Sequence, residues 1–136
     1  GLVESGVPVL GICIGMQLLF EDSEEGEEKG LALIPGRVVR LPHYVRVPHM
    51  GWNNLHLHRH SELLEGITED DYFYFVHSYY CVPEDEASIV ASVEYGLQLT
   101  AVVNRGNIYG VQFHPEKSSR KGLLILDNFV HRICRR

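Results

Sequence analysis

The feature that most constrains the fold is a short apolar run that ends at a cysteine flanked by glycines. Val7–Ile12 is continuously apolar, and it overlaps the motif Gly11-Ile12-Cys13-Ile14-Gly15 before residues typical of a helix through Phe20. A run of this length predicts a strand buried on both faces of a parallel sheet. The two glycines permit a sharp strand-to-helix turn that leaves its middle side chain exposed above the sheet. The sequence therefore predicts a nucleophile elbow with Cys13 at its apex.

The chemistry of a thiol fits this position. A cysteine reacts as the thiolate, and the free N–H groups and dipole at a helix N-terminus are expected to lower its pKa. The backbone N–H of Ile14 would be placed to hold a developing oxyanion. The alternative is that Cys13 is only a small apolar residue packed between two glycines, because short motifs also match by accident.

A second polar motif follows the last predicted strand, Asn107–Phe113. His114 comes directly after that strand, Pro115 stiffens the turn, and Glu116 is close enough to hydrogen-bond the imidazole. A cysteine nucleophile needs a base, and the base needs a group that fixes its tautomer. A lone histidine there would more often be a capped core residue, but its place downstream of the cysteine elbow favours a catalytic role.

Composition limits the possible partners. The chain has 136 residues, of which 45% are hydrophobic and 22% charged, as expected for one globular domain. Its formal net charge of −6 argues against nucleic acid or an anionic membrane as partner. Three cysteines without a signal-peptide pattern or a membrane-length apolar run predict reduced thiols in the cytoplasm.

The order of predicted elements indicates an α/β fold with a mixed sheet. A strand and a helix come first, and another strand and helix come last. Ser118 or Ser119 is expected to cap the last helix, whose apolar stripe would contain Leu123, Leu126, Val130 and either Ile133 or Cys134. The middle of the chain is rich in strand patterns, at 36–41, 54–60, 72–80, 88–95 and 99–104, the last two as a hairpin.

Three histidines alternate with leucines between Asn54 and His60. The alternation would place His56, His58 and His60 on one face of a strand. Metal binding is one interpretation, and a solvated strand face is the other. The second is favoured because neither a cysteine nor a carboxylate stands at ligand spacing, so we expect no metal and no other cofactor.

Together, these motifs carry a resemblance to a known family. The segments Gly11-Ile12-Cys13-Ile14-Gly15-Met16-Gln17 and Gln112-Phe113-His114-Pro115-Glu116 resemble the paired signatures of class I glutamine amidotransferases. Within that class, Pro48-His49-Met50-Gly51-Trp52-Asn53 and Phe75-Val76-His77-Ser78-Tyr79 are similar to glutaminase subunits of imidazole glycerol phosphate synthases. The resemblance extends over essentially the whole chain. It implies an open, mixed and largely parallel sheet flanked by helices.

The resemblance also implies roles for individual residues. Cys13 would attack the glutamine carboxamide to give a glutamyl thioester and ammonia. His114 would protonate the ammonia and then activate water, while Glu116 orients the imidazole. The implied substrate-binding positions are Gln17, Glu25, Ser78 and Tyr79. For Glu25, a solvated charge in an acidic loop is an equally good interpretation.

The family resemblance further implies a protein partner, a cyclase with a (β/α)₈ barrel that receives the ammonia for histidine biosynthesis. Trp52, Tyr74 and Lys117 correspond to interface positions, and an exposed aromatic patch near Trp52 is expected to dock the cyclase. The simpler interpretation is that Trp52 and Tyr74 are core aromatics and that Lys117 is a surface charge.

Residues 1–136 are expected to form one partial glutaminase domain. The family's N-terminal βαβ portion, which supplies a second oxyanion N–H, has no counterpart in these residues, so the chain made alone is expected to be a poor glutaminase. Two other functions stay open: a hydrolase of glutamine or γ-glutamyl bonds that needs no partner, and a binding module without catalysis.

Overall fold

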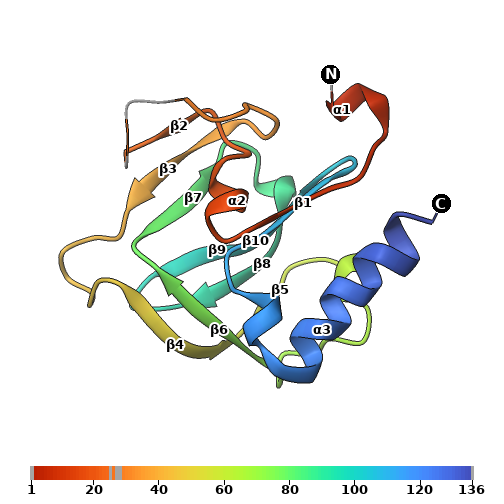
Figure 1. The fold of residues 1–136 in the computed structure, drawn as a ribbon. Helices are drawn as coiled ribbons and strands as arrows, with labels where there is room; N and C mark the ends of the chain where they lie inside the picture. Colours follow the sequence, from red (N-terminus) through yellow and green to blue (C-terminus); the bar gives the residue numbers. More distant parts are fainter. Residues whose placement is uncertain (1, 25, 27–28, 136) are drawn as a thin grey trace.

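The computed structural model describes residues 2–24, 26 and 29–135. The N-terminal part holds the expected elbow, and long stretches of β-structure follow before the final helix (Figure 1). The helices are α1 (Leu2–Ser5), α2 (Ile14–Gln17) and α3 (Ser119–Asn128), with short helical turns η1 (Glu62–Leu64), η2 (Glu86–Ser88), η3 (Pro115–Lys117) and η4 (Phe129–Ile133). The strands are β1 (Val9–Ile12), β2 (Asp22–Ser23), β3 (Gly36–Arg40), β4 (His49–Asn54), β5 (His56–Leu57), β6 (Tyr72–His77), β7 (Tyr79–Pro83), β8 (Ile89–Glu94), β9 (Gln98–Arg105) and β10 (Ile108–Val111).

The main sheet has five strands in the order β1-β10-β9-β8-β5. β1 runs parallel to β10, whereas the other neighbours in this sheet are antiparallel. Within the described residues, the expected α/β class and mixed sheet are confirmed, but the expectation of a largely parallel sheet is wrong. The physical reason is that short turns join β8 to β9 and β9 to β10, and strands joined in this way must run in opposite directions.

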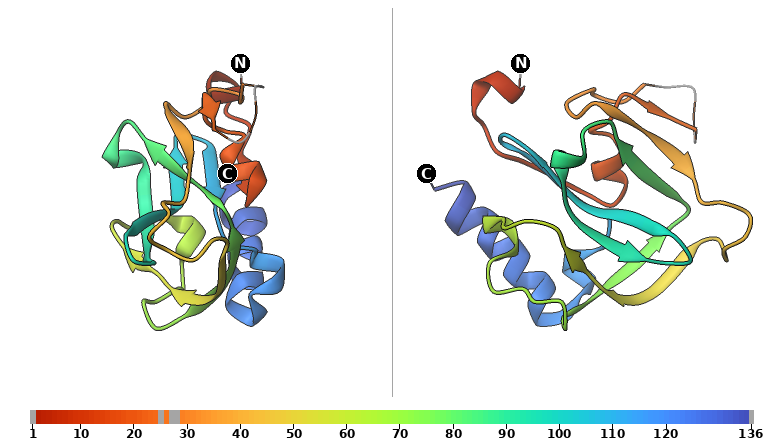
Figure 2. Two further views of the ribbon diagram at one scale, coloured as in Figure 1. Left: turned by 90° about the vertical axis from the view of Figure 1, so that its left-hand side faces the viewer. Right: turned by 180° about the vertical axis from the view of Figure 1, so that it is seen from behind.

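Two smaller sheets adjoin the main one. β2, β3 and β7 form a three-stranded sheet, and β4 pairs with β6 in an antiparallel ribbon. The side view in Figure 2 places α2 and α3 on the same side of the strands, so in this part of the chain these helices do not cover both faces.

The β4–β6 ribbon separates an apolar face from an exposed one. Pairing in register sets His49 opposite His77 and Trp52 opposite Tyr74. Because neighbouring side chains of a strand point to opposite faces, His49 and His77 share the inward face, and Trp52 and Tyr74 share the outward face. Phe73 and Phe75 on the inward face are fully buried.

The core forms two apolar clusters. The larger one joins the main sheet to the β4–β6 ribbon and α3 through Phe73, Phe75, Phe113 and Ile125, all fully buried. The smaller one packs Met16, Leu19 and Phe20 of the elbow helix and the residues after it against Ile108 of β10. Packing against β9 and β10 therefore fixes the position of the elbow segment relative to the main sheet.

The final helix begins where the sequence predicts, but its buried face differs. Leu123 and Val130 of the expected stripe are exposed, whereas Ile133 is buried as expected. Gly122 and Ile125, which lie outside the expected stripe, are buried as well. The Ser118 hydroxyl does not cap α3, because it hydrogen-bonds the backbone of Tyr74 and His114 instead. None of the helices in the described ranges combines the length and apolar character that crossing a membrane requires.

Candidate active site

The elbow is formed where β1 meets α2. Cys13 stands between them with φ 54° and ψ −109°, a conformation that is costly for a residue with a side chain. A Cβ on Gly11 would lie 2.5 Å from the carbonyl oxygen of Gly15, so only glycine permits this close packing of strand against helix. The Cys13 N–H donates to the Val111 carbonyl at 2.8 Å, which fixes the turn to β10. The predicted strand–turn–helix geometry is confirmed, but the Cys13 side chain is half-buried rather than exposed.

The thiol of Cys13 is half-buried and held by two contacts. It donates to the carbonyl of Val76 at 3.7 Å, and the side-chain amide of Gln112 donates to the sulfur at 3.9 Å. Burial raises the pKa of the Cys13 thiol above its ordinary value, and the backbone N–H of Ile14 offsets this only in part. The expectation of a lowered thiol pKa is therefore wrong, because desolvation outweighs the N-terminus of a helix of four residues.

His114 and Glu116 form the expected pair. Nδ1 of His114 lies 3.0 Å from Oε2 of Glu116, and the imidazole is largely covered whereas the carboxylate is half-exposed. The backbone holds His114 on both sides: its N–H donates to the Tyr74 carbonyl at 3.0 Å, and its own carbonyl accepts from the Ser118 hydroxyl at 2.6 Å. Because Nδ1 faces the carboxylate, Nε2 is the nitrogen left for proton transfer.

The structure brings the three triad candidates to one region of the molecule. The charges of Glu116 and Lys117 both act on the Cys13 thiol, with opposite effects on its pKa. His114 is not among the hydrogen-bond partners that the described residues provide to the sulfur. Such catalytic contacts are often long before substrate binds.

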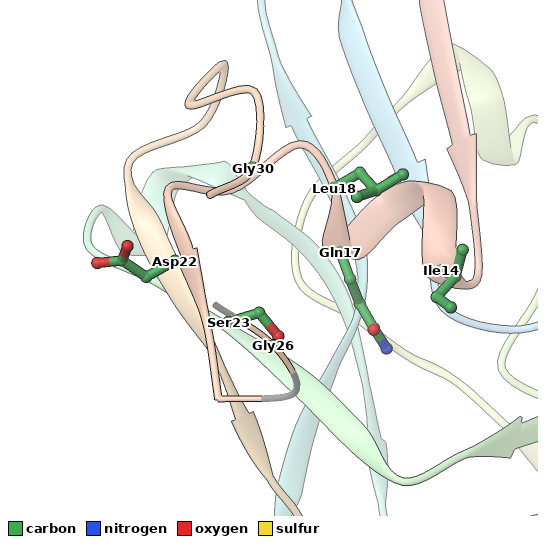
Figure 3. A pocket seen from close by; sticks show the side chains of 7 residues that line it. All are labelled: Ile14, Gln17, Leu18, Asp22, Ser23, Gly26 and Gly30. Carbon is green, nitrogen blue, oxygen red and sulfur yellow. The ribbon is translucent and has the colours of Figure 1, made fainter. Parts of the chain in front are cut away.

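A cavity of about 150 Å³ opens beside the thiol. Its walls come from the elbow and from the end of β6 with the residues that follow, namely Cys13, Ile14, Gln17, Val76, His77, Ser78 and Tyr79. A second cavity of about 300 Å³ adjoins it and shares Ile14 and Gln17. Figure 3 shows the Gln17 side chain extending from α2 into this second cavity, across from Ser23 and Gly26, while Asp22 points away from α2.

The predicted substrate-binding residues meet different outcomes. Ser78 and Tyr79 line the cavity that contains Cys13. Gln17 also lines it but is only 9% exposed, and its side-chain amide donates to the Tyr79 carbonyl at 3.1 Å. Glu25 lies outside the described residues.

Two buried polar residues at the site were not singled out from the sequence. Gln112 is 1% exposed and contacts both Gln17 and the sulfur of Cys13. His77 lines the cavity and hydrogen-bonds the Tyr79 carbonyl through Nδ1 at 2.8 Å. The available signal was a polar residue close to an aromatic in a strand pattern. Gln112 directly precedes Phe113, and His77 lies two residues after Phe75, on the same strand face.

Two of the candidate interface residues, Trp52 and Tyr74, lie on the outward face of the β4–β6 ribbon. Trp52 is 49% exposed and packs against the half-buried Tyr74, with ring centroids 5.7 Å apart and ring planes tilted by 58°. Met50 on the same face is 62% exposed, and Lys117 in η3 is exposed as well. These exposures fit a docking patch better than a core role for Trp52.

The three alternating histidines do not share a site. β5 ends at Leu57, so the alternation does not continue as a strand through His60. His58 Nε2 lies 2.7 Å from the Ser92 hydroxyl, whereas His60 Nε2 lies 3.1 Å from Glu65. Among the described residues, no cluster of three or more histidine, cysteine or carboxylate side chains is arranged to hold a metal ion.

Known proteins resemble this chain over most of its length. The subunit HisH of imidazole glycerol phosphate synthase from Desulfitobacterium hafniense (strain Y51) is 56% identical over 92% of this chain and 60% of its own. The corresponding subunit from Moorella thermoacetica is 55% identical, over 94% of this chain and 61% of its own. The chain thus spans about 60% of the length of these curated relatives.

Solved structures show the same fold at lower identity. A Thermoplasma acidophilum protein described as a GMP synthase subunit aligns with a TM-score of 0.70 at 22% identity, over 98% of this chain and 60% of the other. A glutamine amidotransferase from Thermotoga maritima aligns with a TM-score of 0.61 at 17% identity, over 98% and 53%. The family described as Glutamine amidotransferase class-I matches residues 1–133. With its cysteine elbow and its histidine–glutamate pair, this chain belongs to the class-I glutamine amidotransferase family.

Proposed function

We propose that the chain carries the glutaminase site of an imidazole glycerol phosphate synthase. It would hydrolyse glutamine to glutamate and ammonia, and a cyclase partner with a (β/α)₈ barrel would use the ammonia in histidine biosynthesis. The proposal assigns residues 1–136 to part of one glutaminase domain in the cytoplasm, where the free thiol stays reduced. The observation that carries it is the cavity shared by the strained Cys13 and the segment from Val76 to Tyr79.

The proposed reaction begins with proton transfer from Cys13 to Nε2 of His114. The thiolate then attacks the side-chain carbonyl carbon of glutamine, and the oxyanion that forms accepts a hydrogen bond from the Ile14 N–H. His114 returns its proton to the leaving nitrogen, so that ammonia departs and a glutamyl thioester remains. His114 next takes a proton from water, whose oxygen attacks the thioester carbonyl. The C–S bond then breaks, glutamate leaves, and His114 returns its proton to the Cys13 thiolate.

The raised pKa of the thiol gives His114 a defined task in this scheme. At neutral pH Cys13 is a neutral thiol, so the attack requires a base rather than a thiolate that is already formed. Glu116 supports that base because a carboxylate on Nδ1 stabilises the imidazolium. Gln17, Ser78 and Tyr79 are proposed to hold the substrate, and Glu25 is proposed to face its amino group.

The proposal is tested with a diazoketone analogue of glutamine, which alkylates a nucleophile only after binding as substrate. One label per chain on Cys13 is expected, with none in Cys13→Ala and about 100-fold slower labelling in His114→Asn. Cys134→Ser is the matched control, because that exposed cysteine lies outside the cavity. Labelling of Cys134 instead of Cys13 would contradict the assignment.

A second measurement separates a partnered subunit from an independent hydrolase. Glutamine hydrolysis is measured by glutamate release with and without a barrel cyclase from one of the relatives. A rise of at least tenfold on adding the cyclase is expected. Equal rates in both samples would favour a hydrolase that needs no partner.

A further inference from the structure

A pair of buried histidines takes no part in the reaction proposed above. His49 on β4 is 1% exposed and His77 on β6 is 6% exposed, and Nδ1 of His49 lies 2.9 Å from Nε2 of His77. His49 is also stacked between Phe75 and Tyr95, with ring centroids 4.9 Å and 4.0 Å away. Two imidazoles buried in direct contact cost solvation, so their retention calls for a role that apolar residues could not fill.

The proton positions in the pair follow from its partners. The Tyr79 carbonyl can only accept, so Nδ1 of His77 carries a proton. Burial lowers the pKa of His77 to about 4 and also lowers that of His49, so both rings are neutral near pH 7. Nε2 of His77 is then bare and accepts from Nδ1–H of His49. At the far end, Nε2 of His49 lies 2.8 Å from Oδ1 of Asn53. A bare Nε2 and an amide oxygen both accept, so this tautomer of His49 requires the Asn53 amide to be turned, with Nδ2 donating to the ring.

The same Tyr79 carbonyl connects the histidines to the thiol. It accepts from Nε2 of Gln17 as well as from His77, at 3.1 and 2.8 Å. Gln17 Nε2 also lies 3.5 Å from Oε1 of Gln112, whose own Nε2 donates to the sulfur of Cys13 at 3.9 Å. A continuous series of hydrogen bonds therefore runs from His49 to the nucleophile; we call it the histidine–glutamine network (His49, His77, the Tyr79 carbonyl, Gln17 and Gln112).

We infer that His49 and His77 are positioning residues, which fix the Tyr79 carbonyl and through Gln17 and Gln112 hold the Cys13 thiol in place. The inference rests on the proposed function, since it concerns the same site. Its physical basis is that the Tyr79 carbonyl accepts two hydrogen bonds at once, from Gln17 and from His77, which restricts its position. If the carbonyl moved, these buried donors would lose their acceptor and stay unsatisfied. Movement of Tyr79 would also shift the wall of the cavity beside the sulfur.

The first test uses ¹⁵N NMR of the histidine rings in the whole chain. The neutral network requires Nδ1 protonated and Nε2 bare on both His49 and His77 at pH 7. Each assignment is made by comparison with the single His→Phe variants. A bare Nδ1 on His77 would overturn the inference, because that ring could not then donate to the Tyr79 carbonyl.

The second test replaces His49 by phenylalanine, which keeps the stack between Phe75 and Tyr95 but removes the donor to His77. His49→Phe is expected to lower kcat for glutamine hydrolysis about tenfold and to change KM less than threefold. His58→Phe is the matched control, because it loses a bond of 2.7 Å to Ser92 outside the network. Wild-type kcat in a folded His49→Phe protein would overturn the inference.

A rescue variant separates positioning from simple loss of stability. His77→Asn keeps a side-chain N–H near the place of Nδ1, whereas His77→Phe removes it. His77→Asn is expected to retain at least threefold more activity than His77→Phe, with both compared below their melting temperatures. Equal activities would contradict the role of the Tyr79 carbonyl.

The rate at which iodoacetamide alkylates Cys13 tests the histidine–glutamine network without using glutamine. His49→Phe is expected to change this rate at least threefold, whatever the outcome of the glutaminase assays. If wild-type protein is not labelled by the glutamine analogue, the proposed function fails while this measurement still tests the network. If the analogue labels Cys13 but neither rate responds to His49→Phe, the network inference alone fails.

Discussion

Cys13 combines a strained backbone with a thiol that resists ionisation. Its φ of 54° places the sulfur at the cavity, and burial there raises the pKa of the thiol. The two effects have one origin, because the turn that presents the side chain also directs it between the elbow and the Val76 carbonyl. Reactivity at neutral pH must then come from His114 rather than from the helix N-terminus.

Alkylation of Cys13 is expected to follow a pH profile with its midpoint above the ordinary thiol pKa of about 8.5. The thiolate is the reacting form and burial disfavours it. Iodoacetamide rates between about pH 6 and 10, measured by mass spectrometry in Cys134→Ser, check this expectation. Cys81 serves as an internal control, since it is 1% exposed and should stay unlabelled. A midpoint at or below the ordinary value would contradict it.

The lowered pKa of the buried His77 is expected to make the free energy of unfolding depend on pH. The pKa of His77 falls from 6.5 to about 4 in the fold because the ring is buried. Between these values the unfolded chain binds a proton that the folded chain does not, so the free energy of unfolding decreases as the pH falls through this window. The loss approaches roughly 3 kcal/mol at the acid end. Urea denaturation at several pH values measures it, and His77→Asn is expected to flatten the slope. An unchanged slope would assign the effect to other groups.

At the scale of elements, the close packing of β1 against α2 in the elbow requires glycine at Gly11 but not at Gly15. A Cβ at Gly11 would meet backbone atoms of Gly15 and Met16 within 3 Å, whereas a Cβ at Gly15 would meet nothing within 4 Å. Backbone cannot yield as a flexible side chain does, so β1 and α2 would have to separate.

Gly11→Ala is expected to lower the free energy of unfolding by about 1–3 kcal/mol, as overpacking does. Gly15→Ala is the matched control, and because alanine favours a helix it should be neutral or stabilising by up to about 1 kcal/mol. Urea denaturation of both variants gives the comparison. Equal destabilisation by the two substitutions would show that the close strand–helix contact does not govern the elbow.

The final helix shows where periodicity failed. Apolar residues recur at a helical spacing on more than one side of α3 and η4, so the pattern alone did not select the buried face. The contacts did: Gly122 fits against the Pro115 carbonyl, and Asn128 donates to the carbonyls of Leu63 and Glu65. A buried asparagine satisfied by η1 and the residue after it could not be inferred from a search for apolar stripes.

At the scale of the whole molecule, the β4–β6 ribbon connects an outward aromatic face to the inward histidine pair. Trp52→Ala is expected to weaken binding of the proposed cyclase at least tenfold, since exposed tryptophans dominate many interfaces. Val82→Ala, an exposed apolar position on the separate β3–β7 pair, is the control and should leave binding unchanged. Isothermal titration with a relative's cyclase measures both, and equal affinities would remove Trp52 from the interface.

Glutamine hydrolysis by residues 1–136 alone is expected to be slow. Residues 1–136 span about 60% of the length of the curated relatives. The elbow offers the Ile14 N–H to the oxyanion, and in other enzymes removing a single oxyanion donor costs about 100- to 1,000-fold. The measurement is glutamate release at saturating glutamine, with Cys13→Ala as the blank. A rate typical of efficient enzymes, about 10 per second or more, would contradict the expectation.

The sequence by itself determined the elbow, the position of the histidine–glutamate pair and the strand-rich middle of the chain. These features depend on local chemistry: glycines permit a turn, and a proline stiffens the loop between neighbouring residues. The elbow and the pair were therefore predictable from Gly11, Cys13, His114 and Glu116 before any contact was known, and the strand-rich middle from its β-branched and aromatic residues.

Only the tertiary structure decided the direction of the strands, the buried face of α3 and the state of the thiol. Each of these depends on atoms brought together from distant parts of the sequence. The Val76 carbonyl and Gln112 reach Cys13 only after the sheets assemble, and the solvation they remove sets the pKa of the thiol. His49 and His77 likewise became a pair only when β4 and β6 aligned in register.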